Sequence, residues 1–471
     1  MTTSVITVGL SLASLGCVLG LACGELHAHA AEPALQLVGV ARVDITPSEP
    51  IRLTGYAARK TNSVGIEQNL WAKALAIGTD ADGPVVLVTL DLCGIAERTY
   101  RVMLDRLQAQ AKLQPAQVAM ACSHTHSGPC TTDWAPNIFA QDIPPEQQAA
   151  IDRYTATLVD KVEQVALAAL RARQPARLAW AQGQVGFAMN RRSARAGGYV
   201  ISPNTNGPVD RSLPMLCVTE PGGQIRAVWV NYACHCTTLG AEFNKVCGDW
   251  AGFAQQAIER ELPGAIGLVT IGCGGDANPH PRGGPDHGLA LARQHGDAIA
   301  AEVKRLLQAP LRPVGGPVRA QLRRLDLPFA PHFSRAEWEH RATQPGIVGY
   351  HARKNLARLD RGEALPRTLP YWVQAWNFGR ELVMVFLPGE VVVDYALRLK
   401  QELDGSRLWL TAYANSVPCY IPSRRILTEG GYEAEDSMWY YDRPARLAPE
   451  VEELIVQAVH KVVPAGFARK P

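Results

Sequence analysis

Short apolar runs alternate with amphipathic helical stretches along most of this chain. Strand-like patterns predict strands at residues 35–46, 70–77, 84–91, 117–122, 176–188, 212–219, 225–234, 266–271, 318–327, 371–377, 382–387 and 408–413. Helical periodicity predicts helices at residues 97–113, 144–173, 250–262, 288–308, 334–361, 391–403 and 449–462. Strands and helices interleaved in this way predict a mixed α/β fold, with layered β-sheets flanked by helices.

Two polar stretches interrupt this pattern, and we expect both to be loops. Residues 190–208 are rich in Gly, Ser, Asn and Pro, and loops of this length inside a domain are usually functional or mobile. Residues 272–284, GCGGDANPHPRGG, follow an apolar run and contain glycines that let the backbone approach a ligand closely. The second stretch lacks the Lys-Ser/Thr ending of a phosphate-binding loop, so it does not predict nucleotide binding.

The first thirty residues differ in composition from the rest of the chain. Residues 5–21 are apolar or small, and the sequence AHAA at 28–31 fits a small-residue cleavage site. We therefore expect an exported protein with a signal peptide at residues 1–30 and a single domain at residues 31–471. The alternatives are an uncleaved anchor, a buried helix or a lipidated Cys23.

Composition and charge limit the classes of partner. Of the 471 residues, 47% are hydrophobic and 19% are charged, which is ordinary for a folded globular protein. The formal net charge of +3 is small for this length, so a nucleic-acid partner is not expected. No internal apolar segment reaches transmembrane length. Peripheral membrane contact stays open, and the sequence does not determine the oligomeric state.

The cysteines allow disulfides without defining them. Eleven cysteines are present, and because Cys17 and Cys23 lie in the predicted signal peptide, nine follow it. An odd number in an exported protein implies a free thiol or an intermolecular bridge. Several lie next to histidines, as Cys122 and Cys130 do around His124, so disulfides could brace a site there. No CxxC spacing supports a structural zinc site.

A pair of histidines follows the apolar run 117–122. In extended backbone, residues two positions apart project to the same side, so His124 and His126 are expected to face one site. Gly128 and Pro129 then predict a turn. Chemistry in α/β proteins is commonly placed where strands end. The competing interpretation makes one histidine functional and the other a hydrogen-bonded core residue.

Other strand ends carry residues of the same chemical class. Asp91, His235 and Glu390 each lie at the end of an apolar run. Asp91 fits a loop-capping role as well as a supporting role behind a site, and His280 in the glycine-rich loop is more typical of an exposed histidine. Two or three histidines with one carboxylate form the ligand set of a hydrolytic zinc site. Zinc lowers the pKa of a bound water from about 15.7 to about 7, which favours amide or ester hydrolysis.

Five short motifs share an order and a spacing with one enzyme family. They are SHTHSGP at 123–129, NYACH at 231–235, GDANPH at 275–280, PGE at 388–390 and NSVPCYIPS at 415–423. Together they resemble the zinc amidase domain of the neutral/alkaline, non-lysosomal ceramidases, over about residues 38–441.

The resemblance implies a zinc ion (Zn2+) held by four side chains. His124 is the first histidine of the family's HTHSG motif, and His235 ends the family's hydrophobic strand. Glu390 matches the carboxylate of the PGE turn, and Tyr420 matches the family's tyrosine, with Tyr413 close by as an alternative.

The resemblance also implies roles for residues beside the zinc ion. His126 would hydrogen-bond the attacking water or stabilise the oxyanion, with Tyr420 as a second oxyanion contact. Asp276 and Asn278 of the glycine-rich loop are further catalytic candidates. The family carries a serine where this chain has Asn278, whose amide could donate a hydrogen bond in its place.

The implied function is an exported zinc-dependent amidohydrolase that cleaves the N-acyl bond of ceramide or a related lipid or small-molecule substrate. About thirty residues follow Tyr441, too few for the C-terminal β-sandwich of full-length family members, so we expect that domain to be absent. Its absence bears on the ceramide substrate more than on zinc hydrolysis. The alternatives are a zinc esterase, an amidase for non-lipid substrates, a non-catalytic binding protein on the same scaffold, and a cysteine hydrolase using Cys234 or Cys236.

Overall fold

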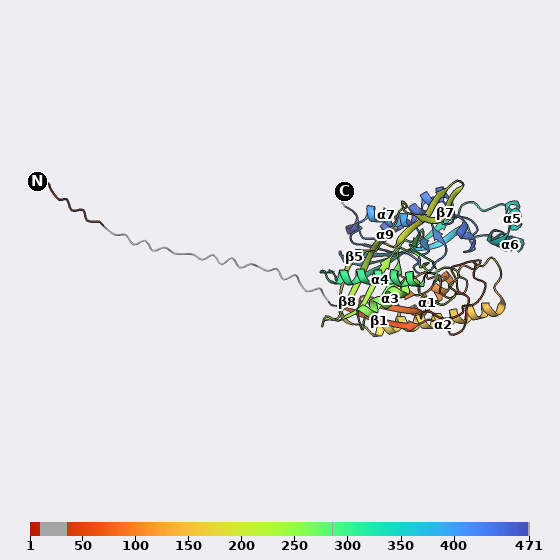
Figure 1. Cartoon of the computed structure of the whole chain (residues 1–471), viewed down its shortest axis with the longest axis horizontal. Coiled ribbons are helices and arrows are strands. Elements are labelled where there is room, and N and C mark those ends of the chain that lie inside the picture. Colours follow the sequence, from red (N-terminus) through yellow and green to blue (C-terminus); the bar gives the residue numbers. More distant parts are fainter. Residues whose placement is uncertain (10–34, 285, 470–471) are drawn as a thin grey trace. The chain divides into compact units, whose positions relative to one another are not determined.

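Most apolar runs of the sequence form strands of two packed sheets in the computed structural model, which describes residues 1–9, 35–284 and 286–469. The predicted signal peptide lies largely outside the described residues. The fold below is that of the unit Pro33–Pro471 (Figure 1).

The larger sheet has nine strands within the described ranges, in the order β10-β9-β8-β5-β1-β2-β3-β4, with β12 paired to β5. They are β1 (Gln36–Asp44), β2 (Trp71–Ile77), β3 (Val85–Leu90), β4 (Val118–Cys122), β5 (Gln174–Gln184), β8 (Ser212–Thr219), β9 (Ile225–Tyr232), β10 (Ile266–Ile271) and β12 (Arg312–Val314). The pairs β3–β4 and β9–β10 are parallel, which places the carboxyl ends of neighbouring strands at the same edge.

Three smaller sheets complete the β-structure. The second sheet contains β13 (Val318–Pro328), β14 (Thr368–Phe378), β15 (Leu382–Phe386) and β17 (Leu408–Thr411). A three-stranded sheet contains β11 (Ala277–Pro279), β6 (Ala188–Arg195) and β7 (Gly198–Asn204). A parallel pair of two-residue strands, β16 (Glu390–Val391) and β18 (Tyr420–Ile421), lies at the candidate site.

Helices occupy most of the predicted positions. They are α1 (Glu97–Ala111), α2 (Pro145–Arg171), α3 (Asp249–Glu261), α4 (Leu289–Leu307), α5 (Arg335–Ala342), α6 (Gly346–Asp360), α7 (Val393–Glu402), α8 (Arg424–Glu429) and α9 (Val451–Val462). Short 3-10 helices span Pro115–Gln117, Asp436–Trp439 and Ala465–Phe467.

Alternate side chains of the strands face different layers. On β3, Val86 belongs to the core shared with α1 and α2, whereas Leu87 belongs to the core between the two large sheets. On β14, Trp376 packs into the core between the sheets, and Val373 packs toward α7 and α9. The layers are therefore helix, sheet, sheet and helix, with α2 and α9 on opposite sides (Figure 1). The predicted mixed α/β fold with flanked, layered sheets is confirmed.

The predicted loop at residues 190–208 is wrong. β6 and β7 form an antiparallel hairpin across most of this segment, and β11 pairs with the other edge of β6. The side chains of Arg191 and Arg192 are buried because both guanidinium groups pair with Glu433. A strand that is buried through ion pairs has no apolar alternation, so its hydropathy pattern did not reveal it.

The predicted helical segment 334–361 is divided into α5 and α6. Ser334 caps the start of α5 through a reciprocal capping box with Glu337. Pro345 lies between the helices, where its missing N–H and fixed ring disfavour a continuous helix.

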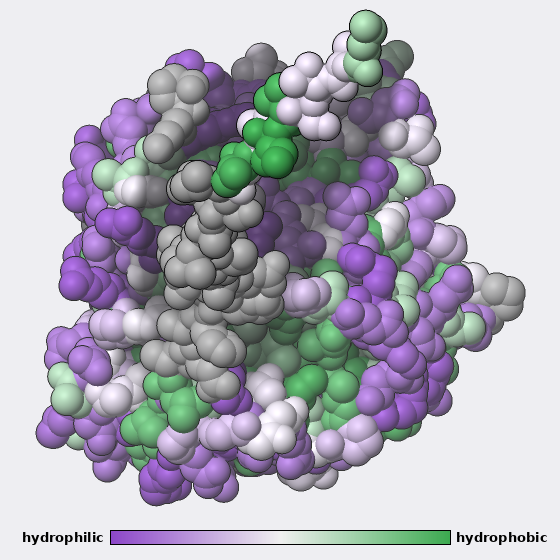
Figure 2. All heavy atoms as spheres, turned by 90° about the vertical axis from the view of Figure 1, so that its left-hand side faces the viewer, coloured by the Kyte–Doolittle hydropathy of each residue, from purple (hydrophilic) through white to green (hydrophobic). Residues whose placement is uncertain are grey.

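The nine cysteines outside the predicted signal peptide are free and buried. The disulfides that the spacing allowed are therefore not formed within the described ranges. Hydrophilic side chains cover most of the coloured surface on the face shown in Figure 2, and hydrophobic ones occur there in smaller groups.

Asp91 connects three elements, which are the strands β2 and β3 and the helix α3. It follows β3, and its Oδ2 accepts a hydrogen bond from the backbone N–H of Trp71 at 2.9 Å. Its Oδ1 accepts a hydrogen bond from Nε2 of Gln255 on α3 at 2.8 Å. The side chain is buried and does not line the cavity at the candidate site. Of the two roles open from the sequence, the structure favours the capping role.

Replacing Asp91 by Ala is expected to lower the free energy of unfolding by about 2–4 kcal/mol, because two buried donors lose their acceptor. Urea unfolding of the metal-loaded protein measures this loss. Asp91→Asn, which keeps one acceptor oxygen, should lose less. A change below about 0.5 kcal/mol in Asp91→Ala would contradict the structural role, since surface changes give values of that size.

Candidate metal centre

His124 lies just beyond β4, at the edge where β4 runs parallel to β3. Its φ is +56°, so extended backbone does not continue through the histidine pair as the sequence suggested. The turn nevertheless brings His124 and His126 together, with their Nε2 atoms 3.1 Å apart. The Nδ1 of His124 lies 2.6 Å from the carbonyl oxygen of Cys93, beyond the end of β3. That contact fixes the ring and leaves Nε2 facing the site.

His235 reaches the same site from the end of β9. Its Nδ1 lies 2.8 Å from the carbonyl oxygen of Gly274, in the loop after β10. A parallel bridge between Thr125 and Cys236 ties the loop after β9 to the loop after β4. Each imidazole therefore donates its Nδ1–H to a backbone carbonyl, and the unprotonated Nε2 of each points into the site.

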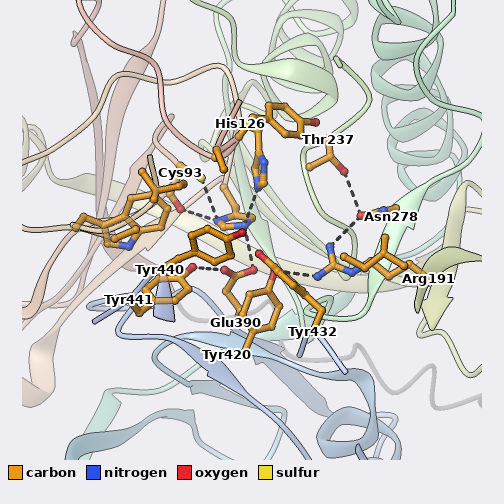
Figure 3. A pocket seen from close by; sticks show the side chains of 18 of the residues that line it. Cys93, His126, Arg191, Thr237, Asn278, Glu390, Tyr420, Tyr432, Tyr440 and Tyr441 are labelled. Carbon is orange, nitrogen blue, oxygen red and sulfur yellow. Dashed lines mark hydrogen bonds and ion pairs between the residues drawn. The ribbon is translucent and has the colours of Figure 1, made fainter. Parts of the chain in front are cut away.

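Glu390 and Tyr420 are register partners in the β16–β18 pair. Oε2 of Glu390 lies 3.1 Å from Nε2 of His124 and 3.0 Å from Nε2 of His235. The hydroxyl oxygen of Tyr420 lies 3.2 Å from Nε2 of His235. The four side chains expected to bind a metal thus converge on one point. Figure 3 shows Glu390 and Tyr420 side by side at this point.

The glycine-rich loop after β10 allows this convergence. A Cβ on Gly274 would lie 2.6 Å from the backbone nitrogen of Cys234, and a Cβ on Gly275 would lie 2.5 Å from the carbonyl oxygen of Glu390. Both distances are shorter than real Cβ contacts, so the loop passes between the His235 and Glu390 segments only because it carries no side chains there.

The donor set fits a divalent metal ion. Nε2 of His124, Nε2 of His235 and Oε2 of Glu390 lie within 4.8 Å of one another, and all three residues are buried. Oε2 of Glu390 is buried without a hydrogen-bond donor. Oε2 of Glu390 lies 3.1 Å and 3.0 Å from the two imidazole nitrogens, and tetrahedral ligands about 2.0–2.1 Å from zinc stand about 3.3 Å apart.

Tyr420 fits the ligand set better than Tyr413. The hydroxyl of Tyr413 lies 3.4 Å from Nδ1 of His235, on the side of the ring that faces away from Glu390. Only Tyr420 places its oxygen on the Nε2 side of His235. Burial raises the pKa of the Tyr420 hydroxyl, and the adjacent Arg191 guanidinium acts in the opposite direction.

A second group of possible ligands overlaps the first and fits less well. It consists of Cys93, His124 and His126. Sγ of Cys93 lies 3.6 Å from Nδ1 of His124, but that nitrogen already faces the Cys93 carbonyl oxygen. Burial raises the pKa of the Cys93 thiol well above its usual range, which disfavours the thiolate that a metal requires.

Two supporting contacts were missed by the sequence analysis. The hydroxyl of Tyr441 donates a hydrogen bond to Oε1 of Glu390, which leaves Oε2 for a metal. Nη2 of Arg191 donates to the Tyr420 hydroxyl at 2.8 Å. Arg191 and Tyr441 lie outside the five motifs, and only their three-dimensional neighbours reveal these contacts.

His126 is held on the wall of the site as a neutral imidazole. Its ring packs edge-on against Tyr56, with centroids 4.9 Å apart. A Cβ on Gly55 would lie 2.4 Å from Cγ of His126, and Gly55 has a φ of +90°, so glycine is required there. Burial, with the neighbouring His124 and His235, holds the pKa of His126 well below its usual value. The ring is therefore uncharged at neutral pH.

The centre opens into a cavity of about 290 Å³. Asn278 lines this cavity, as predicted, but Asp276 does not. Oδ1 of Asp276 accepts a hydrogen bond from the first backbone N–H of α7 at Val393, and Oδ2 accepts one from Asn190. Burial raises the pKa of Asp276 to about 7. The structure does not bring Asp276 or His280 into the ligand group.

Comparison with known proteins identifies the family. The family model described as "Neutral/alkaline non-lysosomal ceramidase, N-terminal" matches residues 36–268. The chain belongs to the neutral/alkaline non-lysosomal ceramidase family.

Similarity to individual family members is distant in sequence and clear in fold. The chain is 24% identical to a neutral ceramidase of Pseudomonas aeruginosa over 63% of its length, and 23% identical to neutral ceramidase A of Dictyostelium discoideum over 55%. These alignments span 46% and 38% of the relatives' own length. The crystal structure of the Pseudomonas enzyme superposes with a TM-score of 0.68, at 19% identity, covering 93% of this chain and 76% of that one. A structure titled as ceramidase complexed with C2 gives a TM-score of 0.69, at 18% identity, covering 93% and 77%.

Removing a ligand should abolish metal binding, whereas removing a supporting contact should only weaken it. We expect His124→Ala and His235→Ala to lose stoichiometric metal, measured by elemental analysis after dialysis. Tyr441→Phe keeps all four candidate ligands and should weaken metal affinity by about 10-fold to 100-fold, in a competition titration with a chelator. A His235→Ala protein that retains one tightly bound metal would contradict the ligand assignment.

Proposed function

We propose that this protein is a zinc-dependent amidohydrolase that cleaves the N-acyl amide bond of ceramide or a related N-acylated substrate. The observation that carries the proposal is the convergence of Nε2 of His124, Nε2 of His235 and Oε2 of Glu390, all buried, beside a cavity. Membership of the ceramidase family supports amide hydrolysis, and the relatives' names supply ceramide as the first substrate to test.

His124, His235, Glu390 and Tyr420 would hold the zinc ion. When bound there, zinc supplies a Lewis acid that polarises an acyl oxygen and lowers the pKa of water.

The chain's own residues would position the substrate and move one proton. Neutral His126 would accept a proton on Nε2 from the attacking water and deliver it to the leaving nitrogen. The Tyr420 hydroxyl, held by Arg191, faces the region where negative charge develops on the acyl oxygen, and it would stabilise that charge. The C–N bond breaks, the acyl carbon gains the water oxygen, and the amine leaves with the transferred proton.

Aromatic and aliphatic side chains would exclude water from the acyl group. Trp134, Ile138, Tyr432 and Tyr440 line the cavity beside the centre. The Trp134 ring is fixed because its Nε1 donates to the carbonyl oxygen of Val417 at 3.0 Å. A rigid apolar wall next to the ligand group suits an acyl chain and strengthens electrostatic interactions at the reacting carbonyl.

The cysteine-hydrolase alternative has little structural support. Cys234 and Cys236 are fully buried, and neither lines the cavity. Burial raises the pKa of both thiols well above their usual range. The esterase alternative uses the same centre, so the substrate panel below separates it from amide hydrolysis.

We also propose that the protein is exported, on the apolar composition of its first thirty residues and the small-residue site that follows. Within the described residues, no helix has the length and apolar character needed to cross a bilayer.

Turnover should require zinc and should be highest on amides. We expect the purified protein to release fatty acid from a short-chain ceramide or an N-acyl amino acid, to lose this activity after chelation, and to regain it with zinc. Mass spectrometry of products from a panel of amides and matched esters measures both rates. Thiol-blocking reagents should have little effect. Activity that persists in fully chelated protein would overturn the proposal.

His126→Gln should separate proton transfer from metal binding. The change removes the proton acceptor and leaves the proposed ligand set intact, so metal content should be retained while kcat falls by about 10²-fold to 10⁴-fold. The pH profile of kcat should also lose its acidic limb. If His126→Gln instead loses its metal, His126 is a ligand and its assigned role is wrong.

A further inference from the structure

The cavity beside the metal centre has a cation on its wall that the hydrolysis proposed above does not use. Arg282 lines the cavity together with Asn278. Its Nη2 donates a hydrogen bond to the Tyr56 hydroxyl at 2.9 Å, and within the described ranges no carboxylate forms an ion pair with it. The guanidinium group is exposed, so a small ligand in the cavity can reach it.

The position of Arg282 is fixed more firmly than that of an ordinary surface arginine. On one side, the carbonyl oxygen of Pro281 contacts Nε2 of His295 at 2.9 Å. On the other side, the N–H of Gly283 donates to the carbonyl oxygen of Thr238 at 2.9 Å. The Tyr56 hydroxyl, which accepts the hydrogen bond from Arg282, is itself anchored because it donates to the carbonyl oxygen of Leu239 at 2.7 Å. Backbone and side chain are therefore both held at the cavity.

The orientation of Asn278 adds a second donor to the same cavity. Its Oδ1 accepts hydrogen bonds from Nη1 of Arg191 at 3.1 Å and from Oγ1 of Thr237 at 3.2 Å. Those contacts fix the orientation of the amide, because both hydrogen bonds are accepted by Oδ1. Its Nδ2 has no acceptor among the described residues and is not enclosed, so it is free to donate to a bound molecule.

No carboxylate that lines the cavity pairs with Arg282, although the buried Asp249 is close enough to interact with it electrostatically. Glu390 is the one carboxylate among the cavity-lining residues, and its two oxygens face the metal ligands and Tyr441. The charge of Arg191 is balanced by Glu433, 2.8 Å away and buried. A neutral lipid amide makes no use of the remaining guanidinium, whereas an acidic substrate would pair with it.

We propose that the substrates are N-acylated amines that carry a carboxylate on the amine side, such as N-acyl amino acids, with the carboxylate bound by Arg282 and by Nδ2 of Asn278. The inference rests on the amide hydrolysis proposed above. A carboxylate has two oxygens in one plane and so matches the guanidinium fork and a neighbouring amide donor.

The layout of the cavity assigns each half of the substrate to one wall. Tyr440 and Tyr441 lie to one side of Glu390, and Thr237, Asn278 and Arg191 lie to the other (Figure 3). With the amide carbonyl at the ligand group, the acyl chain faces the aromatic wall, and the amine portion faces the wall that carries donors. Hydrolysis adds water across the C–N bond and releases a fatty acid and a free amino acid.

The test compares N-lauroylglycine with N-lauroylglycinamide, which differ only in carboxylate against carboxamide, and includes a short-chain ceramide. On the zinc-loaded protein, kcat/KM for the carboxylate should exceed that for the carboxamide by at least about tenfold, mainly through KM. Arg282→Gln should reduce this ratio to near one. Arg282→Lys should give an intermediate ratio, because lysine keeps the positive charge and loses the planar pair of guanidinium donors.

Arg293→Gln is the matched control, because Arg293 is a nearby exposed arginine that pairs with Glu67 outside the cavity. It should leave the ratio unchanged. Preference for the carboxamide or ceramide, or a ratio that Arg282→Gln does not change, overturns the inference while leaving the proposed hydrolase intact.

A zinc-loaded protein that cleaves no amide in the panel would refute the proposed hydrolase. The inference is then decided by calorimetric Kd values for the same two glycine compounds. Tighter binding of the carboxylate that is lost in Arg282→Gln supports it, and equal Kd values reject it.

Discussion

The convergence of two imidazole nitrogens and one carboxylate oxygen, all buried, is the constraint on which this structure depends. Each histidine gives its Nδ1–H to a backbone carbonyl, so neither ring turns its other nitrogen away from Glu390 without losing that bond. A cation between His124, His235 and Glu390 would bring these three donors into favourable contact. Since the segments after β4, after β9 and at β16 all meet there, metal binding and the packing of these loops should stabilise one another.

The polar groups around this centre form a single connected network. Arg191 contacts Glu433, Tyr420 and Asn278, and so joins a candidate ligand to a residue of the cavity wall. Buried ion pairs contribute little net stability, because desolvation offsets much of their attraction. The value of the Arg191–Glu433 pair is therefore in positioning: it sets where the Tyr420 oxygen lies and which way the Asn278 amide points.

The fold is shared with neutral ceramidases, and the cavity beside the metal centre has two chemically different walls. An apolar wall suits an acyl group, while a held guanidinium and an oriented amide form the facing wall. In the proposed hydrolase, the metal would act on the amide group that all N-acyl substrates share. Selection among substrates would then depend on residues such as Arg282, which lies in the glycine-rich loop rather than on the strands that carry the candidate ligands.

The sequence alone determined the layers and predicted the four candidate ligands. Hydropathy patterns with a period of two residues in strands and 3.6 residues in helices depend only on the local sequence. β1–β4, β8–β10 and α1–α4 therefore lie close to their predicted ranges. The order of short motifs pointed to His124, His235, Glu390 and Tyr420. Tertiary structure alone decided which oxygen or nitrogen faces the centre. It turned His124 into a left-handed conformation, built a hairpin from residues 190–208 through buried ion pairs, and sent Asp276 to cap α7. These outcomes depend on side chains far away in the sequence, or on backbone groups that carry no sequence signal, and local patterns contain no information about either.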